Sequence, residues 1–341
     1  MKKKVLIALS GGVDSAAAAA LLRQQGYDCA GATLRLCQGE AAIADARRAA
    51  EALGLPFYEV DGRELFEQEV MARFTAEYCA GHTPNPCIDC NRELKFGFLM
   101  DWALSRGYDY LATGHYARVE QGPEGFRLLR GRSRRKDQSY MLYQLTQRQL
   151  SHLLLPLGEL EKEDARVAAR AAALPNAEKA DSQDICFVPD GDYVGFLQSR
   201  GVVLQPGDFI DGAGRVLGRH RGLPCYTTGQ GKGLGISLGR HVYVVAKNAA
   251  DNTVQLGEDA ELYSDELTAG RFCWISGRAP VGPLPCSAKT RYSQREAEAE
   301  TAVLPDGRVR VTFREAQRAI TAGQAVVLYG GDTVLGGGTI E

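Results

Sequence analysis

The sequence of 341 residues has no hydrophobic run long enough to cross a membrane. The Ala-rich stretch 16–22 is far shorter than the ~20 apolar residues that a spanning helix needs. Three lysines precede the apolar run Val5–Leu9, as in a signal peptide, but Asp14 follows where such a run would continue. We therefore expect a cytoplasmic protein without a membrane partner.

A disulfide framework and an excess of positive charge are also missing. Nine cysteines, an odd number scattered along the chain, indicate reduced thiols rather than paired ones. A formal net charge of -2 gives no overall attraction to nucleic acid, so such binding needs a local patch. One candidate is RGRSRRK, Arg130–Lys136, with five basic residues in seven, although such a run alone is typical of a solvated loop or hairpin.

The pattern of apolar residues divides the chain into three parts. Short apolar runs alternate with helical patterns up to about residue 190, which predicts a parallel, Rossmann-like α/β sheet. Glycine and proline multiply from residue 191, and short alternating strands follow from Arg271. We predict an α/β fold with an N-terminal domain over 1–190, a small central domain over 191–270 and a C-terminal antiparallel β-barrel over 271–341.

Several elements of the first part are specific enough to assign by residue range. Strands are predicted at 4–9, 29–36, 56–60 and 108–115, and helices at 13–26, 40–54, 65–78, 93–107 and within 156–175.

SGGVDS, Ser10–Ser15, lies between a predicted strand and a predicted helix. Its backbone N–H groups and the helix amino end can hold an anion, although an ordinary tight turn is the alternative. The stretch matches neither the Walker A motif nor the dinucleotide-binding glycine motif. Because ligands of doubly wound sheets sit at the carboxyl ends of strands, we expect this loop to meet Gly114 and His115.

TPNPCIDCN, Thr83–Asn91, places Cys87 and Cys90 three residues apart. Such a pair can be a metal knuckle, a redox disulfide, or a nucleophile with an unrelated neighbour. Cys186, inside the apolar stretch ICFV, would by itself be interpreted as a buried inert thiol. The residues alone leave these alternatives open.

In its strand-to-helix context SGGVDS resembles the PP-loop of the ATP pyrophosphatase superfamily. The chain as a whole is similar to the tRNA-specific 2-thiouridylase family. The segments that carry this resemblance span nearly the whole chain and include HTPNPCIDCNRELKF, ATGHYA, KDQSYMLY, DSQDICFV, GQGKGLG, KTRYS and LGGGTIE. It implies a PP-loop ATP-binding thiolation domain, a central tRNA-binding domain and a barrel. The implied enzyme uses ATP to adenylate the C2 oxygen of the wobble uridine in tRNAs for Lys, Glu and Gln, and then replaces that oxygen with sulfur.

The resemblance also implies a role for each matching residue. Cys90 is the expected nucleophile, and Cys186 is expected to carry a persulfide from a donor protein, either a cysteine desulfurase or a sulfur-relay protein. Asp14 is expected to bind Mg²⁺ or to orient the loop rather than act as a base. The expected ATP contacts are Ala8, Leu9, Ser10, Gly11, Gly12, Val13, Asp14, Ser15, Leu34 and Gly114. The expected tRNA contacts are Asn85, Pro86, Cys87, His115, Lys136, Asp137, Gln138, Arg291, Tyr292 and Gln324.

The chemistry adds two expectations for the cysteines. Sulfur must be delivered by a macromolecule and then shielded from water, so we expect the cysteines on loops. An electropositive phosphate-binding site should favour both thiolates. Two departures from the family pattern are a single basic residue in GQGKGLG and a short segment after the second strand, which leaves the role of Cys37 open.

Three alternatives to this mechanism or function stand beside it. Cys87, Cys90 and Cys186 could hold an iron–sulfur cluster that carries the sulfur. The chain could instead be a zinc-stabilised RNA-binding protein without catalysis, using His82, Cys87 and Cys90. It could also be another PP-loop enzyme, such as an amidotransferase or argininosuccinate synthase, with a small acceptor.

Overall fold

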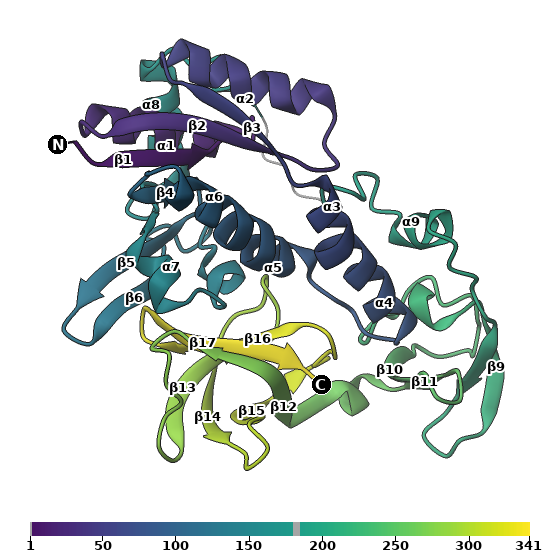
Figure 1. Cartoon of the computed structure of the whole chain (residues 1–341). Helices are drawn as coiled ribbons and strands as arrows, with labels where there is room; N and C mark the ends of the chain where they lie inside the picture. Colours follow the sequence, from purple (N-terminus) through teal and green to yellow (C-terminus); the bar gives the residue numbers. More distant parts are fainter. Residues whose placement is uncertain (1, 180–184) are drawn as a thin grey trace.

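The computed structural model describes residues 2–179 and 185–341 (Figure 1). Along the chain follow a five-stranded sheet, a four-stranded sheet and an eight-stranded sheet that contains a closed barrel. The N-terminal layer lies above the barrel in Figure 1, and the small sheet lies to one side. The predicted fold class is confirmed. None of the described helices combines the length and apolar composition that crossing a bilayer requires.

The N-terminal sheet is parallel throughout, in the order β3–β2–β1–β4–β7. Its strands are β1 Lys4–Ala8, β2 Asp28–Arg35, β3 Phe57–Asp61, β4 Tyr110–Ala112 and β7 Leu153–Leu154. Successive side chains of a strand point to opposite faces, and β1 therefore supplies two cores. Val5 and Ile7 pack with α1 (Val13–Gln24), α2 (Glu40–Ala52) and α8 (Lys162–Ala171), whereas Leu6 packs on the other side.

Two long helical runs cover that other face, where Leu6 joins their buried side chains. The first comprises α3 Arg63–Phe66, η1 Glu67–Ala72 and α4 Arg73–Cys79. The second comprises α5 Pro86–Asp89, the π-helical η2 Cys90–Leu99 and α6 Met100–Ser105. It begins before the predicted residue 93, because Pro86 occupies the first helical position and the Asn85 side chain accepts a hydrogen bond from the Cys87 N–H.

The central sheet has the order β10–β11–β8–β9. Phe209, Tyr226 and Val244 are buried in its small core. The preceding helix α9 (Tyr193–Ser199) packs instead against α4, where Leu197 lies in a cluster with Phe74 and Tyr78. The strands and short helices of this part are β8 Gly207–Ile210, β9 Val216–His220, η4 Leu223–Cys225, β10 Tyr243–Asn248, β11 Thr253–Gly257 and η5 Asp259–Leu262.

Six antiparallel strands close into the C-terminal barrel, in the order β12–β15–β14–β13–β16–β17, with β17 pairing back to β12. The strands are β12 Tyr263–Trp274, β13 Leu284–Lys289, β14 Ala297–Val303, β15 Val309–Arg318, β16 Ala325–Gly330 and β17 Thr333–Ile340. The predicted boundary at residue 271 falls inside β12. The first four residues of this strand are all exposed, so they lack the alternation that marks a strand in sequence.

A hairpin from the first 190 residues extends the barrel sheet. It consists of β5 (Ala117–Gly122) and β6 (Gly125–Arg130), and β6 pairs with β17 at Leu129 and Thr333. Between this hairpin and β7 lie η3 Ser139–Leu142 and α7 Gln147–Ser151. The N-terminal domain and the barrel therefore share backbone hydrogen bonds and do not meet through side chains alone.

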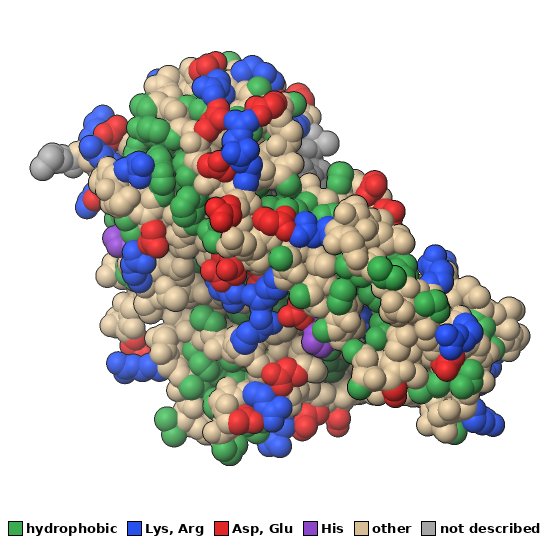
Figure 2. Space-filling view, turned by 45° about the vertical axis from the view of Figure 1, so that its right-hand side comes forward, with side chains coloured by type: hydrophobic (Ala, Val, Ile, Leu, Met, Phe, Trp, Pro, Cys, Tyr) green, Lys and Arg blue, Asp and Glu red, His purple; other side chains and the backbone are tan. Residues whose placement is uncertain are grey.

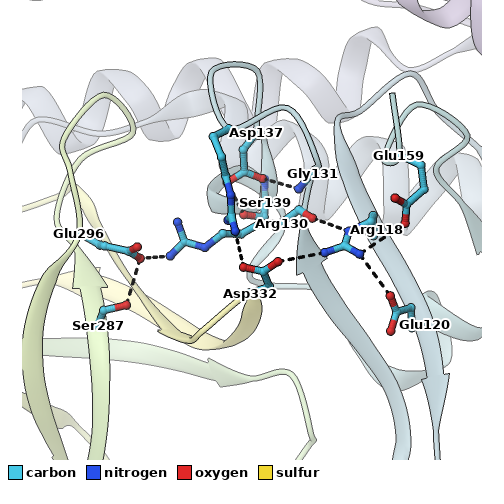
Figure 3. A network of polar contacts seen from close by, with 11 residues as sticks. Arg118, Glu120, Arg130, Gly131, Asp137, Ser139, Glu159, Ser287, Glu296 and Asp332 are labelled. Atoms are coloured by element: carbon cyan, nitrogen blue, oxygen red, sulfur yellow. Dashed lines mark hydrogen bonds and ion pairs between the residues drawn. The ribbon is translucent and has the colours of Figure 1, made fainter. Parts of the chain in front are cut away.

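Ion pairs reinforce this junction and involve part of the basic run (Figure 3). Arg130 is buried, forms an ion pair with Glu296, and stacks its guanidinium 3.7 Å from the Tyr329 ring centroid. Arg134 forms an ion pair with Asp332. These two arginines stabilise the domain junction, so the run Arg130–Lys136 is not a uniformly free patch for phosphates.

Candidate active site

The loop Ser10–Ser15 connects β1 to α1 and is shaped by its own hydrogen bonds. The Ser15 hydroxyl accepts from the Ser10 N–H at 3.1 Å and donates to the Gly12 carbonyl at 3.1 Å. Gly11 has a φ of +75°, and a Cβ there would lie 2.6 Å from the Ala42 carbonyl oxygen, so only glycine fits. Gly12 caps α1 without a side chain, which leaves the first helical N–H groups able to bind an anion.

Residues distant in the sequence hold this loop through hydrogen bonds. Asn176 donates from Nδ2 to the carbonyls of Gly11 and Gly12, each at 3.2 Å. Lys162 donates to both oxygens of the Asp14 carboxylate, at 2.7 and 2.9 Å, and the Tyr116 hydroxyl donates to Asp14 Oδ1 at 2.8 Å. Both oxygens of the Asp14 carboxylate thus accept hydrogen bonds from protein side chains. This arrangement suits the expected loop-orienting role better than direct Mg²⁺ binding.

Gly114 lies against the start of α1, as the sequence predicted. A Cβ at Gly114 would lie 2.7 Å from the Asp14 carbonyl carbon and 2.7 Å from the Ser15 nitrogen. The neighbouring strand β2 brings Leu34 to the same edge of the sheet, where it is buried. Of the other expected ATP contacts, Leu9, Val13 and Ser15 are buried, Ala8 and Gly12 are half-buried, and Ser10 is exposed.

Cys87 and Cys90 lie one helical turn apart in α5 and at the start of η2, so the expectation of a loop is wrong for Cys90. A π-helix hydrogen-bonds residues five apart, and this geometry places Lys95 one turn after Cys90. The Lys95 charge acts to lower the pKa of both thiols. The sequence reasoning missed Lys95, although it lies inside the quoted motif CNRELKF.

Burial outweighs that charge. It raises the pKa of Cys90 to about 11 and also raises the pKa of Cys87. For Cys90 the structure thus opposes the expectation that an electropositive site favours the thiolate, because burial has the larger effect on its pKa. Both thiols are predominantly protonated at neutral pH.

Cys186 lies in a turn and is exposed, so the loop expectation holds for this cysteine and the interpretation as a buried thiol does not. Its neighbour Phe187 anchors the turn, with ring centroids 5.2 Å from Phe74 and 5.0 Å from Phe196. Its Sγ lies 3.8 Å from the Sγ of Cys37. The hydrogen bond between the two sulfurs lowers the pKa of Cys37 and raises that of Cys186.

His115 connects the thiols with the anion loop. It follows Gly114, its ring centroid lies 5.8 Å from that of Phe96, and its Nδ1 shares a 2.7 Å hydrogen bond with the Thr113 hydroxyl. Burial, with a smaller contribution from the Lys95 charge, lowers the pKa of His115 well below its usual value. The imidazole is thus neutral at pH 7 and can exchange hydrogen bonds with a base but cannot supply a cation to a phosphate.

The expected tRNA contacts fall into two groups. Gln324 lies next to the cysteine helix, because its Nε2 donates to the Thr83 carbonyl at 2.6 Å. A small cavity opens beside Asn85, with Arg73 and Arg271 in its wall. Figure 2 shows blue Lys and Arg side chains among acidic ones where the N-terminal layer meets the barrel.

The second group is tied into the fold. Asp137 is buried and accepts hydrogen bonds from the backbone N–H groups of Gly131 and Ser139, at 3.0 and 3.1 Å. Gln138 accepts from the Tyr116 N–H at 3.0 Å. Arg291 donates to the carbonyls of Thr228 and Ala319 and so links the central part to the barrel. Lys136 and Tyr292 are partly accessible; 37% of the Tyr292 surface is exposed.

The described residues do not form a metal site. Among them, no three His, Cys, Asp or Glu side chains come together in a geometry that could hold a metal ion. His82 is instead paired with Glu77, with 2.6 Å between Nδ1 and Oε2. Within the described residues, the side chains of Cys87, Cys90 and Cys186 are thus not gathered as a set of metal ligands, and neither are those of His82, Cys87 and Cys90.

Comparison with known proteins accounts for nearly the whole chain. The model of the tRNA methyl transferase HUP domain matches residues 3–190, the tRNA methyl transferase PRC-barrel domain matches 195–258, and the aminomethyltransferase β-barrel domain matches 264–340. The tRNA-specific 2-thiouridylase MnmA of Carboxydothermus hydrogenoformans is 49% identical, covering 100% of this chain and 98% of that protein. The proteins of the same description from Acetivibrio thermocellus and Clostridium beijerinckii are 46% and 45% identical, each covering 100% of this chain and 99% of theirs.

Proposed function

The chain belongs to the tRNA-specific 2-thiouridylase family and is a tRNA sulfurtransferase that forms 2-thiouridine, and on that premise we propose how its residues divide the reaction. Family membership excludes the alternatives of a non-catalytic zinc protein and of a PP-loop enzyme with a small acceptor. The proposal concerns the mechanism, the residues, the cofactors and the partners.

The first step is activation of the wobble uridine by ATP. The C2 oxygen of the uridine attacks the α-phosphorus, and pyrophosphate leaves from the loop Ser10–Ser15. The amino end of α1 supports this assignment, because it has no side-chain cap and its first N–H groups can bind phosphate oxygens, and Gly114 packs closely against the same end. Mg²⁺ would neutralise charge on the phosphates, with ligands drawn mainly from phosphate oxygens and water because Asp14 is committed to Lys162.

The second step is sulfur transfer from a persulfide on Cys186. The terminal sulfur attacks C2 of the activated uridine and AMP leaves with the former C2 oxygen. The Cys90 thiolate then attacks the Sγ of Cys186, the sulfur–sulfur bond breaks, and the terminal sulfur stays on C2 as the thiocarbonyl. A Cys90–Cys186 disulfide remains and must be reduced before the next turnover.

One observation carries this proposal: the anion loop and the thiols meet through consecutive residues at one edge of the sheet. Gly114 touches the start of α1, and His115 beside it lies next to Phe96 and in the field of Lys95. The same lysine acts on Cys87, Cys90 and Cys186. The proposed transfer requires the turn that carries Cys186 to move toward an activated uridine bound at this edge.

The partners follow from the accessibility of the site. Exposed Cys186 supports delivery of sulfur by another protein, a cysteine desulfurase or a sulfur-relay protein. The tRNA substrates would be those for Lys, Glu and Gln, held by Asn85, Pro86, Cys87, His115, Lys136, Tyr292 and Gln324, with phosphate contacts from the exposed arginines Arg132 and Arg135. We infer a cytoplasmic location, because the proposed tRNA substrates and sulfur donors would act in that compartment.

Thiolation of tRNA transcripts with a cysteine desulfurase and cysteine tests the proposal, with pyrophosphate and 2-thiouridine measured separately. Cys90→Ser and Cys186→Ser should still release pyrophosphate on adding tRNA and should lose 2-thiouridine by more than about a thousandfold. Cys79→Ser is the matched control, because Cys79 is exposed in α4 outside the site. Full thiolation by Cys90→Ser would overturn its assignment as nucleophile.

A further inference from the structure

Cys37 is the thiol in direct contact with the carrier Cys186, and the proposed reaction does not use it. The two sulfurs lie 3.8 Å apart and both residues are exposed. Among the described residues, no hydrogen-bond contact joins Cys186 to Cys90 or Cys87, although the charge of Cys186 acts to raise the pKa of both of these thiols. Cys186 therefore rests beside a thiol that sequence reasoning left without a role.

Both thiols project from turns whose neighbouring residues are anchored. Cys37 follows β2, and the Gln38 side chain fixes its turn by accepting from the Leu36 N–H at 2.9 Å and donating to the Leu34 carbonyl. On the other side, Ile185 accepts a 2.8 Å backbone hydrogen bond from Val188, and Phe187 packs among aromatic rings. The two sulfurs are therefore held in contact by two segments whose backbones are fixed by hydrogen bonds and packing.

We propose that Cys37 is a resolving thiol that discharges the persulfide of Cys186 when no activated uridine is bound. This inference rests on the proposed carrier role of Cys186. The Cys37 thiolate attacks the Sγ of Cys186, the bond from Sγ to the terminal sulfur breaks, and the terminal sulfur leaves with the electron pair as hydrosulfide. The Cys37 sulfur is oxidised as the Cys37–Cys186 disulfide forms and the terminal sulfur is reduced to hydrosulfide, while the oxidation state of the Cys186 Sγ does not change, so no external oxidant is needed. A dithiol reductant then restores both thiols.

The carrier sulfur consequently has two fates. With activated tRNA in place, the terminal sulfur goes to C2 of the uridine and Cys90 completes the transfer. Without tRNA, Cys37 is the neighbour in contact and the sulfur returns to solution as hydrosulfide. A persulfide that is exposed on the surface would therefore be short-lived in the free enzyme, which limits its reaction with other thiols.

The test loads the full-length protein with inorganic polysulfide in the absence of ATP and tRNA. Peptide mapping under non-reducing conditions locates the persulfide and any disulfide, and released sulfide is followed with time. Wild type should accumulate the Cys37–Cys186 disulfide with one sulfide released per disulfide. In Cys37→Ser the persulfide on Cys186 should persist at least about tenfold longer, because a hydroxyl cannot displace sulfide.

Cys90→Ser and Cys79→Ser serve as comparison variants, and Cys37→Ala repeats the test without a hydroxyl at this position. The proposed resolution step predicts that both comparison variants lose the persulfide at the wild-type rate. A wild-type disulfide that joins Cys90 to Cys186, or an unchanged persulfide lifetime in Cys37→Ser and Cys37→Ala, would overturn the role of Cys37 alone. If no variant carries a persulfide on Cys186, the carrier assignment falls and the resolution step falls with it.

Discussion

The anion loop and the thiol cluster share one edge of the same sheet but differ in how completely they are built. In the loop, Asn176 and Lys162 hold the backbone of Gly11 and the carboxylate of Asp14 at hydrogen-bond distance. In the cluster, Cys90 is a buried thiol whose pKa is raised, and Cys186 contacts Cys37. The loop is arranged for its ligand before binding, whereas the sulfur-transfer geometry is not yet assembled.

The difference matches the demands of the two half-reactions. Stabilising the charge of a leaving pyrophosphate requires fixed donors, since reorganising them during the reaction would cost free energy. In the proposed sulfur transfer, one thiol has to meet a donor protein and then the target base, so it must move between two positions. A helix carries Cys90, the proposed nucleophile, and a turn carries Cys186, the proposed carrier.

Apart from replacing the cysteines themselves, the largest effect is expected from a change at the anion loop. In Gly114→Ala, the new Cβ would lie 2.7 Å from backbone atoms of Asp14 and Ser15, so the start of α1 must shift. A displacement of this kind costs about a hundredfold in rate. We expect pyrophosphate release and 2-thiouridine formation to fall together, as measured on tRNA transcripts.

Gly39→Ala is the matched control, because Gly39 caps α2 with nothing within 4 Å of its Cβ position. It should retain both activities. Loss of thiolation with normal pyrophosphate release in Gly114→Ala would show that the two regions are not divided as proposed.

A smaller effect is expected at Lys95, the charge shared by the thiols. Burial holds the pKa of Cys90 at about 11, so the thiolate fraction and the transfer rate should rise as pH increases toward that value. Removing the positive charge in Lys95→Met raises the pKa further, and a shift of one unit lowers the thiolate fraction about tenfold at a fixed pH. Single-turnover thiolation should therefore move to higher pH.

Lys95→Arg keeps the charge and should keep the wild-type pH profile. Pyrophosphate release reports on the loop alone and should change little in either variant. A pH profile that does not move in Lys95→Met would mean that Lys95 does not act on the reacting thiol.

The sequence reasoning succeeded where local pattern and strand topology decide the structure. The buried run of β1 and the glycines of Ser10–Ser15 predicted the loop, and the rule for carboxyl ends of parallel strands correctly brought Gly114 to it. The sequence reasoning failed where residues far apart in the chain determine a side chain's surroundings. Nothing near Arg130 indicates that Tyr329 and Glu296 bury it, and nothing near Cys37 indicates that Cys186 lies 3.8 Å away.

The helical run that carries Cys87 and Cys90 was mispredicted for a different reason. The cap at Asn85 and Pro86 was visible in the sequence, but the argument from chemistry favoured a loop there. The resemblance to a family supplied the expected roles of Cys90 and Cys186, which spacing alone left open. It did not supply their protonation, because the pKa of Cys90 depends on the burial that the fold imposes.

The smallest expected effect tests whether the contacts of the anion loop stabilise the protein before ATP binds. Lys162 forms its ion pair with Asp14 at 2.7 Å, with 11% of the lysine side chain and 33% of the aspartate side chain exposed. In Lys162→Met the carboxylate loses this partner, and partial exposure limits the cost to about 1–2 kcal/mol of the free energy of unfolding. Denaturant unfolding without nucleotide measures this change in the free energy of unfolding.

The control Lys3→Met removes an exposed pair with Asp109 and should leave the midpoint unchanged. Equal midpoints for all three proteins would mean that the Lys162–Asp14 pair does not stabilise the loop before ATP binds, which would weaken the contrast with the thiol cluster.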